Sequence, residues 1–249
     1  MAKSDDNTQL ILFENELEAL AKLEQQAEKA TGQVFLSTKG GVLSYRDTPV
    51  AGNALEVVIL ASPVERLYYT TRYDPTNPTG PVCFAMSTTT TGMKPSASST
   101  EPQSETCANC PKDIWGSAPG GGKGKACAEK RRLLIMTADS TKTASSVNLA
   151  EVAALRIPVT SVKGFATYLQ SITTVTKRPL STVVTKISLT PDAKTQFKLQ
   201  FDFVRVIDDM EVARALIGRV EQEVSSAMSQ NTADTGAEAT PDAATSSKF

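Results

Sequence analysis

The distribution of apolar and polar positions along the chain predicts a domain rich in β-strands. From Gln33 to Met86, short apolar or alternating runs are separated by turns such as KGG, PVAGN and DPTNPTGP, which is typical of strands joined by loops. The run RRLLIM predicts a buried strand, and STVVTKISL and TQFKLQFDFVRVI predict two more. In the last of these, Phe197 and Phe201 share one face while Lys198 lies on the other.

Three segments have the spacing of amphipathic helices. LILFENELEALAKLEQQAEKATG predicts an acidic helix that stops at Gly32. TSVKGFATYLQSI predicts a helix capped by Thr160 or Ser161, and DDMEVARALIGRVEQEVSSAM predicts one that begins at Asp208 or Asp209. Helices and strands together indicate an α+β, β-rich fold with flanking helices.

Changes in composition divide the chain into three parts. Residues 1–32 form the acidic N-terminal helix, and residues 33–229 form the β-rich domain, which carries a cysteine-bearing insertion at 83–127. Residues 87–106 within it are rich in Ser, Thr and Pro, which predicts a long surface loop. Residues 230–249 have too little apolar surface to fold and predict a disordered acidic tail.

Charge and composition exclude several classes of function. The chain has no histidine, so a Ser-His-Asp site, an HExxH metal site and a histidine-containing zinc finger are excluded. The net charge of −1 is uneven: residues 1–30 carry −4 and residues 230–249 carry −2, which leaves +5 for residues 31–229. The positive charge of the central domain has two explanations. It could serve to bind a polyanion, or it could belong to an ordinary solvated surface of mixed charge.

The four cysteines, with the spacing C-x23-C-x2-C-x16-C, are candidate metal ligands. Cys107 and Cys110 form a CxxC, the glycines that follow let the chain return to Cys127, and Cys83 supplies a fourth thiol. A structural four-cysteine zinc site uses all four. Four free thiols and an iron–sulfur cluster remain alternatives. Disulfides are disfavoured because nothing marks the chain as exported, and a thioredoxin-type CxxC because the motif does not follow a strand at a helix start.

The run GGGKGKA does not match a phosphate-binding loop. In no register does it fit GxxxxGK[ST], because Gly124 follows Lys123 and Ala126 follows Lys125. No apolar strand immediately precedes it. We therefore interpret the glycines as turn residues, and we expect no nucleotide hydrolysis.

Basic and aromatic residues near the cysteines are candidate contacts to nucleic acid. Non-specific binding of single strands combines cations with side chains on which bases stack. In RLYYTTRY, alternation places Arg66, Tyr68 and Arg72 on one face, although an ordinary exposed strand has the same pattern. The candidate DNA contacts are Arg66, Tyr68, Arg72, Trp115, Lys123, Lys125, Lys130, Arg131 and Arg132.

The two ends of the chain carry further expectations. The N-terminus has charges where a secretory signal needs apolar residues, and no window is apolar enough for a membrane span, so we expect a soluble cytoplasmic protein. Many single-stranded DNA-binding proteins end in a flexible acidic tail with an apolar last residue that partner proteins bind. Phe249 is the candidate here, and a merely solubilising tail is the alternative.

The segments CANCPKDIWGSA and GKGKACAEKRRLLIM resemble a group of tailed-bacteriophage proteins that share CxxCPxxxxGS followed by GKACxxxRRL. The resemblance covers residues 33 to about 205. It implies a single-stranded DNA-binding protein of the OB-fold type, without catalytic activity, that coats DNA in replication or recombination inside the infected host cell. It also implies an OB-like barrel core, and zinc ligands at Cys83, Cys107, Cys110 and Cys127.

Two other functions remain open from the sequence. One is a phage transcription or host-takeover cofactor, whose cysteine insertion and acidic helix contact a polymerase or other phage proteins. The other is a metal-dependent nuclease, for which carboxylates would hold magnesium. Its candidate ligands are Asp202, Asp208, Asp209 and Glu211, of which the last three also suit a helix start.

Overall fold

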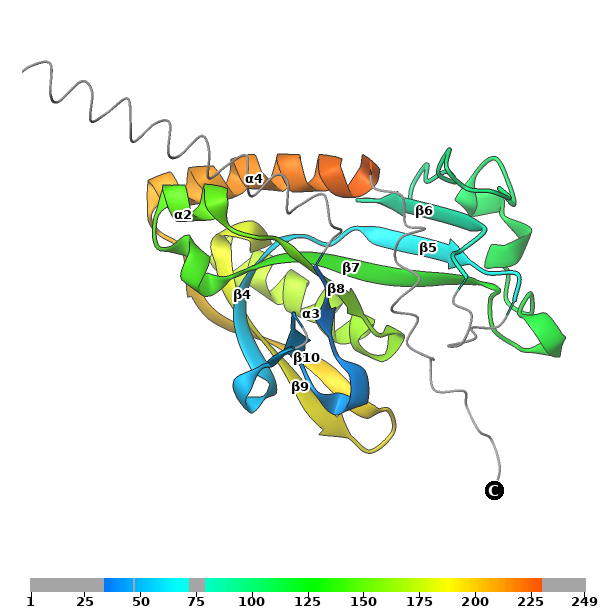
Figure 1. Ribbon diagram of the computed structural model, residues 1–249, viewed down its shortest axis with the longest axis horizontal. Coiled ribbons are helices and arrows are strands. Elements are labelled where there is room, and N and C mark those ends of the chain that lie inside the picture. Colours follow the sequence, from blue (N-terminus) through cyan, green and yellow to red (C-terminus); the bar gives the residue numbers. More distant parts are fainter. Residues whose placement is uncertain (1–33, 47, 72–78, 230–249) are drawn as a thin grey trace, which may run out of the picture. The chain divides into compact units, whose positions relative to one another are not determined.

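The computed structural model describes residues 34–46, 48–71 and 79–229 (Figure 1). The predicted N-terminal helix at 1–32, the tail at 230–249, Arg72 and Phe249 lie outside these residues. No helix in the described segments is both long and apolar enough to cross a membrane.

The described residues form an α+β fold with more strand than helix, as the sequence predicts. A three-stranded sheet and a seven-stranded sheet are present. The small sheet consists of β1 (Leu36–Ser37), β2 (Ser44–Tyr45) and β3 (Thr48–Pro49). The large sheet consists of β4 (Ala54–Ala61), β5 (Val64–Tyr68), β6 (Cys83–Ser87), β7 (Cys127–Thr137), β8 (Ala153–Ile157), β9 (Val183–Asp192) and β10 (Gln196–Val206). The helices are α2 (Ala144–Leu149), α3 (Val159–Thr176) and α4 (Met210–Ser229).

Strand β7 organises the large sheet, whose order is β10-β9-β4-β7-β5-β6. Its first half pairs with β5 and its second half with β4. Strand β8 pairs with Arg131–Ile135 of β7, off this path. Since β10 and β6 lie at opposite ends of the order, the described strands do not close into a barrel. The OB-like core therefore stays a prediction.

Helices cover both faces of the large sheet at the end away from the cysteines. Val58, Leu134 and Val184 pack with Leu216 of α4 and Val147 of α2 in one buried cluster. On the opposite face, the ring of Phe165 in α3 lies 5.1 Å from that of Phe201 in β10, and Tyr168 shares a 2.6 Å hydrogen bond with Thr185. Val184 and Thr185 are neighbours in β9, and alternation in a strand sends their side chains to opposite faces.

A tight turn before β2 packs on β10. Gly41 ends the 3₁₀ turn η1 (Lys39–Gly41) with φ of +75°, a conformation that favours glycine. A Cβ atom on Gly41 would lie 2.0 Å from the Phe197 ring. The residue is therefore required both by its backbone conformation and by the close approach of the ring.

A buried ionic network joins three strands of the large sheet. Glu65 of β5 is fully buried and accepts hydrogen bonds from Arg132 of β7 and Arg156 of β8. Arg156 Nε and Nη2 lie 3.0 and 3.3 Å from the two carboxylate oxygens. The ring of Phe35 lies 5.6 Å from the Arg132 guanidinium and 5.0 Å from that of Arg156. Removing any one partner of this network would leave an unpaired charge in the core, which is strongly destabilising.

Candidate metal and nucleic-acid site

The fold brings all four cysteines to one pocket at the far end of the sheet. Cys83 begins β6 and Cys127 begins β7, and both strands pair with β5 at Tyr68. Cys107 lies in the 3₁₀ turn η3 (Cys107–Asn109), and Cys110 follows it. Cys127 is half-buried, the other three are buried, and none forms a disulfide. We call residues 107–127 the cysteine loop.

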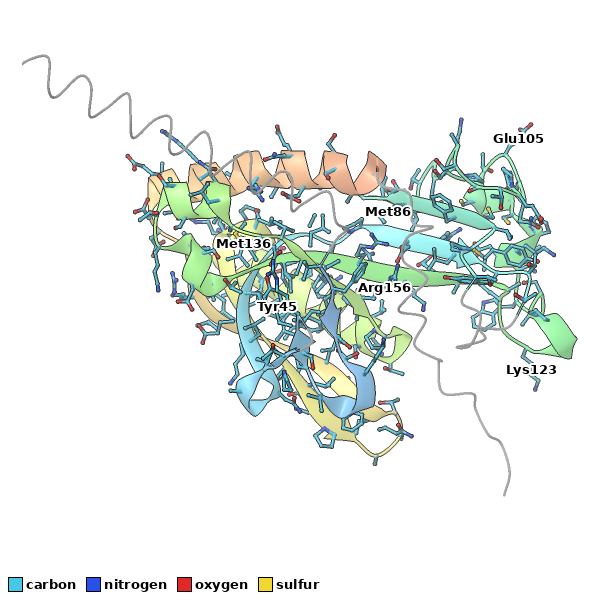
Figure 2. All side chains as sticks on the ribbon, in the orientation of Figure 1. Tyr45, Met86, Glu105, Lys123, Met136 and Arg156 are labelled. Carbon is cyan, nitrogen blue, oxygen red and sulfur yellow. The ribbon has the colours of Figure 1, made fainter. Side chains whose placement is uncertain are left out.

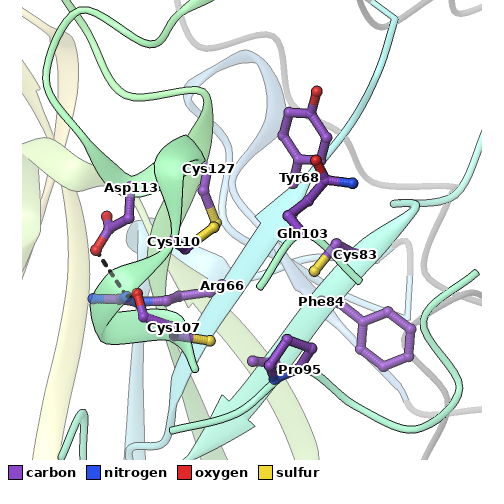
Figure 3. A pocket seen from close by; sticks show the side chains of 11 residues that line it. Arg66, Tyr68, Cys83, Phe84, Pro95, Gln103, Cys107, Cys110, Asp113 and Cys127 are labelled. Carbon is purple, nitrogen blue, oxygen red and sulfur yellow. Dashed lines mark hydrogen bonds and ion pairs between the residues drawn. The ribbon is translucent and has the colours of Figure 1, made fainter. Parts of the chain in front are cut away.

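The pocket is walled by strands on one side and by the cysteine loop on the other (Figure 3). Cysteines separated by up to 44 positions in the sequence therefore line one pocket. The other lining residues are Arg66, Tyr68, Phe84, Ala85, Pro95, Gln103 and Asp113. Pro95 and Gln103 come from the Ser/Thr-rich loop, which contacts β6 through Ser96 N–H to Phe84 O at 2.8 Å.

The four thiols are of the kind that binds a thiophilic metal ion, but they are not close enough together to coordinate one ion. Four thiols in one pocket match the ligands of a structural zinc site. No three Cys, Asp or Glu side chains among the described residues are grouped closely enough to hold a metal ion. Binding by all four thiols would therefore draw the cysteine loop and the strands together.

Burial controls the ionisation of two of these thiols, those of Cys107 and Cys127. It raises the pKa of Cys107, and with the neighbouring Cys110 it raises the pKa of Cys127 to about 12. A thiol of this kind is protonated at neutral pH unless a cation stabilises its thiolate. Metal binding here would release protons.

Arg66 fastens the cysteine loop to the sheet. Its Nη1 atom donates to Cys107 O at 3.1 Å and to Asp113 Oδ2 at 2.9 Å, and its Nη2 atom donates to Glu129 Oε2 at 2.7 Å. The side chain of Arg66 is only 12% exposed. Asp113, which the sequence did not single out, also accepts from Lys125 Nζ at 2.9 Å. The available signal was that Asp113 and Glu129 are the only two acids among six cations between Cys107 and Arg132.

The tip of the cysteine loop displays two large apolar side chains. Ile114 is 61% exposed and Trp115 is 76% exposed. Hydrogen bonds keep this tip folded: Gly116 N–H donates to Gly124 O at 3.0 Å, and Ser117 Oγ accepts from Ala126 N–H at 3.0 Å. Lys125 Nζ lies 6.0 Å from the centre of the Trp115 ring. Lys123 lies in the same loop, at the opposite end of the sheet from Met136 (Figure 2).

The predicted stacking face of RLYYTTRY is wrong for Arg66 and Tyr68. Strand β5 ends at Tyr68, and Arg66 and Tyr68 face the cysteine pocket instead of solvent. Tyr68 is 9% exposed, and Lys112 Nζ lies 5.2 Å from its ring centre. Both side chains therefore hold the cysteine loop against the sheet, and Arg72 lies outside the described residues.

The basic run at the start of β7 is divided between the two faces of the sheet. Arg131 is half-buried and donates from Nη1 to Ser62 O at 3.1 Å. Arg132 is 1% exposed and pairs with Glu65, so its predicted contact with DNA is wrong. Lys130 is half-buried and shares the Arg132 face by alternation, away from the cysteine pocket. Of the predicted contacts, Trp115, Lys123 and Lys125 are brought together in the cysteine loop.

The carboxylates considered for a nuclease site have other roles. Asp209 Oδ1 accepts from the N–H groups of Glu211 and Val212 at 2.9 and 3.0 Å, which caps α4. Asp208 lies 3.7 Å from Arg178. Asp202 is exposed on β10, opposite Lys186 of β9. These residues follow the capping and surface pattern that the sequence also allows.

Comparison with protein-family models, with curated proteins and with solved structures finds no match for this chain. The resemblance to phage DNA-binding proteins stays a prediction.

Proposed function

We propose that the protein binds single-stranded DNA without sequence preference through the tip of the cysteine loop. The observation that carries this proposal is the 76% exposed Trp115 beside Lys125, with Lys123 in the same loop. An exposed indole is a surface on which any base stacks, and neighbouring ammonium groups attract the phosphates. In keeping with the resemblance, the DNA would be coated during phage replication or recombination.

The exposed surface formed by β4, β9 and β10 is a poorer candidate for binding DNA. Glu56, Lys186 and Asp202 are exposed and lie side by side across β4, β9 and β10. Charges of alternating sign in a row favour a solvated surface over a phosphate-binding one. DNA binding in this proposal therefore uses the cysteine loop and does not depend on a closed barrel.

Zinc is the second part of the proposal. We infer that the four cysteines bind one structural zinc ion, which would fix the position of the loop that carries Trp115. The purified protein should contain about one zinc per chain by elemental analysis. Visible absorption from iron would instead identify an iron–sulfur cluster. Protein purified without chelators that holds neither metal would refute this part.

The DNA proposal can be tested with the fluorescence of Trp115, because it is the only tryptophan in the chain. Titration with oligo-dT at low salt should quench this fluorescence and raise the anisotropy of labelled DNA together. Substitution of Trp115 by Ala should weaken binding about 5- to 150-fold, since stacking on one base contributes about 1–3 kcal/mol. Lys142→Ala is the control, because this lysine is 74% exposed, pairs with Asp139 and lies outside the cysteine loop.

The salt dependence gives an independent measure of the same surface. If Lys123 and Lys125 contact phosphates, log Kobs should fall against log salt with a slope of about −1.4. Wild-type protein that leaves oligo-dT unbound at low salt, or Trp115→Ala that binds as well as wild type, would refute the proposal.

A protein partner is the second candidate. The exposed Ile114 beside Trp115 favours it, because an aliphatic side chain contributes more to a protein interface than to DNA. Substitution of Ile114 by Ala separates the two: DNA affinity should be nearly unchanged in the first function, whereas capture of a phage or host polymerase should fall in the second.

A further inference from the structure

Arg66 contacts three segments of the chain that no other described side chain joins in this way. Its guanidinium reaches Cys107 O in η3, Asp113 in the 3₁₀ turn η4 (Pro111–Asp113) and Glu129 in β7. The first two lie on either side of Cys110, and Glu129 is two residues after Cys127. One side chain thus links the segments that carry three of the four cysteines.

The geometry of these contacts requires an arginine. The guanidinium donates four hydrogen bonds. Nη1 donates to Cys107 O and Asp113, while Nε and Nη2 donate to Glu129 at 3.1 and 2.7 Å. The planar, fork-shaped guanidinium of arginine can donate hydrogen bonds to acceptors on two sides at once, whereas the ammonium group of lysine is one compact charge on a flexible stem. The charge is also placed usefully, since it lies beside the pocket in which thiolates would gather.

The contact network continues to the exposed tip. Asp113 accepts from Arg66 at one oxygen and from Lys125 at the other, each at 2.9 Å. Lys125 lies over the Trp115 ring. A path of direct contacts therefore runs from the sheet, past the cysteines, to the tryptophan.

We propose that Arg66 is the positioning residue of the cysteine site: it holds the loop that bears Cys107 and Cys110 in register with the strand that bears Cys127. The inference rests on the proposed zinc site. Polar groups that orient metal ligands from the second layer commonly change metal affinity by about 10- to 100-fold. Arg66 also fixes Asp113, and through it the position of Lys125.

The test is zinc affinity, measured by competition with a chromophoric chelator in the full chain. Arg66→Gln should bind zinc about 10- to 100-fold more weakly than wild type. Arg66→Lys keeps the charge but not the fork, so it should not restore wild-type affinity. Restoration by lysine would refute the positioning role and leave only a role for charge.

Arg156→Gln is the matched control. Arg156 is 14% exposed against 12% for Arg66, and it also donates to a carboxylate within the same sheet. It lies away from the cysteines, so its substitution should lower the melting temperature without changing zinc affinity. Equal losses of zinc affinity in both variants would refute the inference, because a general loss of stability would then explain them.

Two further measurements keep the test decisive. If Arg66→Gln does not fold, Asp113→Asn and Glu129→Gln can replace it, because each variant removes the charge of one carboxylate that Arg66 contacts. Each should weaken zinc binding. Unchanged zinc affinity in both variants would refute the inference. Cobalt-substituted protein adds a spectroscopic reading, since a shifted thiolate–cobalt band in the Arg66 variants reports altered ligand geometry. Wild-type protein without zinc affinity would refute the proposed metal site, whereas wild-type binding that Arg66→Gln leaves intact would refute this inference alone.

Discussion

The buried carboxylate of Glu65 provides the sharpest prediction about stability. Glu65 is fully buried between Arg132, which is 1% exposed, and Arg156, which is 14% exposed. The substitution Glu65→Gln keeps the volume of the side chain but removes the negative charge that both guanidinium groups contact. Breaking a buried ion pair from one side costs about 3–5 kcal/mol. We expect a loss of this size in the free energy of unfolding.

The pH dependence has a defined sign. Burial by itself would raise the pKa of Glu65, but the charges of Arg132 and Arg156 outweigh it and hold the pKa below the ordinary value of 4.5. A carboxyl whose pKa is lower in the folded state stabilises the fold above its unfolded pKa. This contribution should be fully present at pH 7 and should be lost as the pH falls below about 4.5, through the folded-state pKa.

Urea unfolding of both proteins at pH 7 and at successively lower pH measures the effect. Wild type should lose stability in acid more steeply than Glu65→Gln, so the two curves should converge. A difference below about 1 kcal/mol at pH 7 would refute the reasoning, because it is within the range of an exposed ion pair. Parallel curves with no convergence in acid would show that the carboxylate is not the group that titrates.

Two further predictions concern the turn at Gly41 and the cysteine site. Gly41→Ala should destabilise the fold by about 1–3 kcal/mol or more, because its Cβ would lie 2.0 Å from the Phe197 ring. Gly40→Ala is the control in urea unfolding, since φ is also positive there but no atom of the described residues beyond its chain neighbours lies within 4 Å of the added Cβ, so its loss should be smaller. Cys127→Ser should lower the zinc content well below one ion per chain by elemental analysis, while circular dichroism of the large sheet stays near wild type. Full zinc occupancy in that variant would exclude Cys127 as a ligand.

Long elements with clear periodicity could be predicted from the sequence. Strands β9 and β10 and helices α3 and α4 were all anticipated, because each repeats its apolar pattern over ten or more residues. Helix α2 and strand β8 were missed. The five residues AALRI of β8 are buried on both faces, so they show no alternation, and α2 has only six residues.

The cysteine site could be predicted further than the DNA contacts. The spacing of the four thiols indicated one site, and the fold does bring them to one pocket. The directions of Arg66 and Arg132 could not be read from neighbouring residues. Arg132 meets Glu65, which is 67 positions away, and Arg66 meets Asp113, which is 47 positions away. The pairing of β5 with β7 sets the face of the sheet on which each of these side chains lies, and neither of them faces solvent.

The placement of Cys83 and Cys127 at the first residues of β6 and β7 bears on the order of assembly. Cys107 and Cys110 are close in any conformation of the chain, whereas the other two thiols join them only after β5 has paired with both strands. Non-local pairing of this kind is a slow step in folding. The four-thiol pocket is therefore complete only once β5 has paired with both β6 and β7, so its assembly depends on the slow pairing of the sheet.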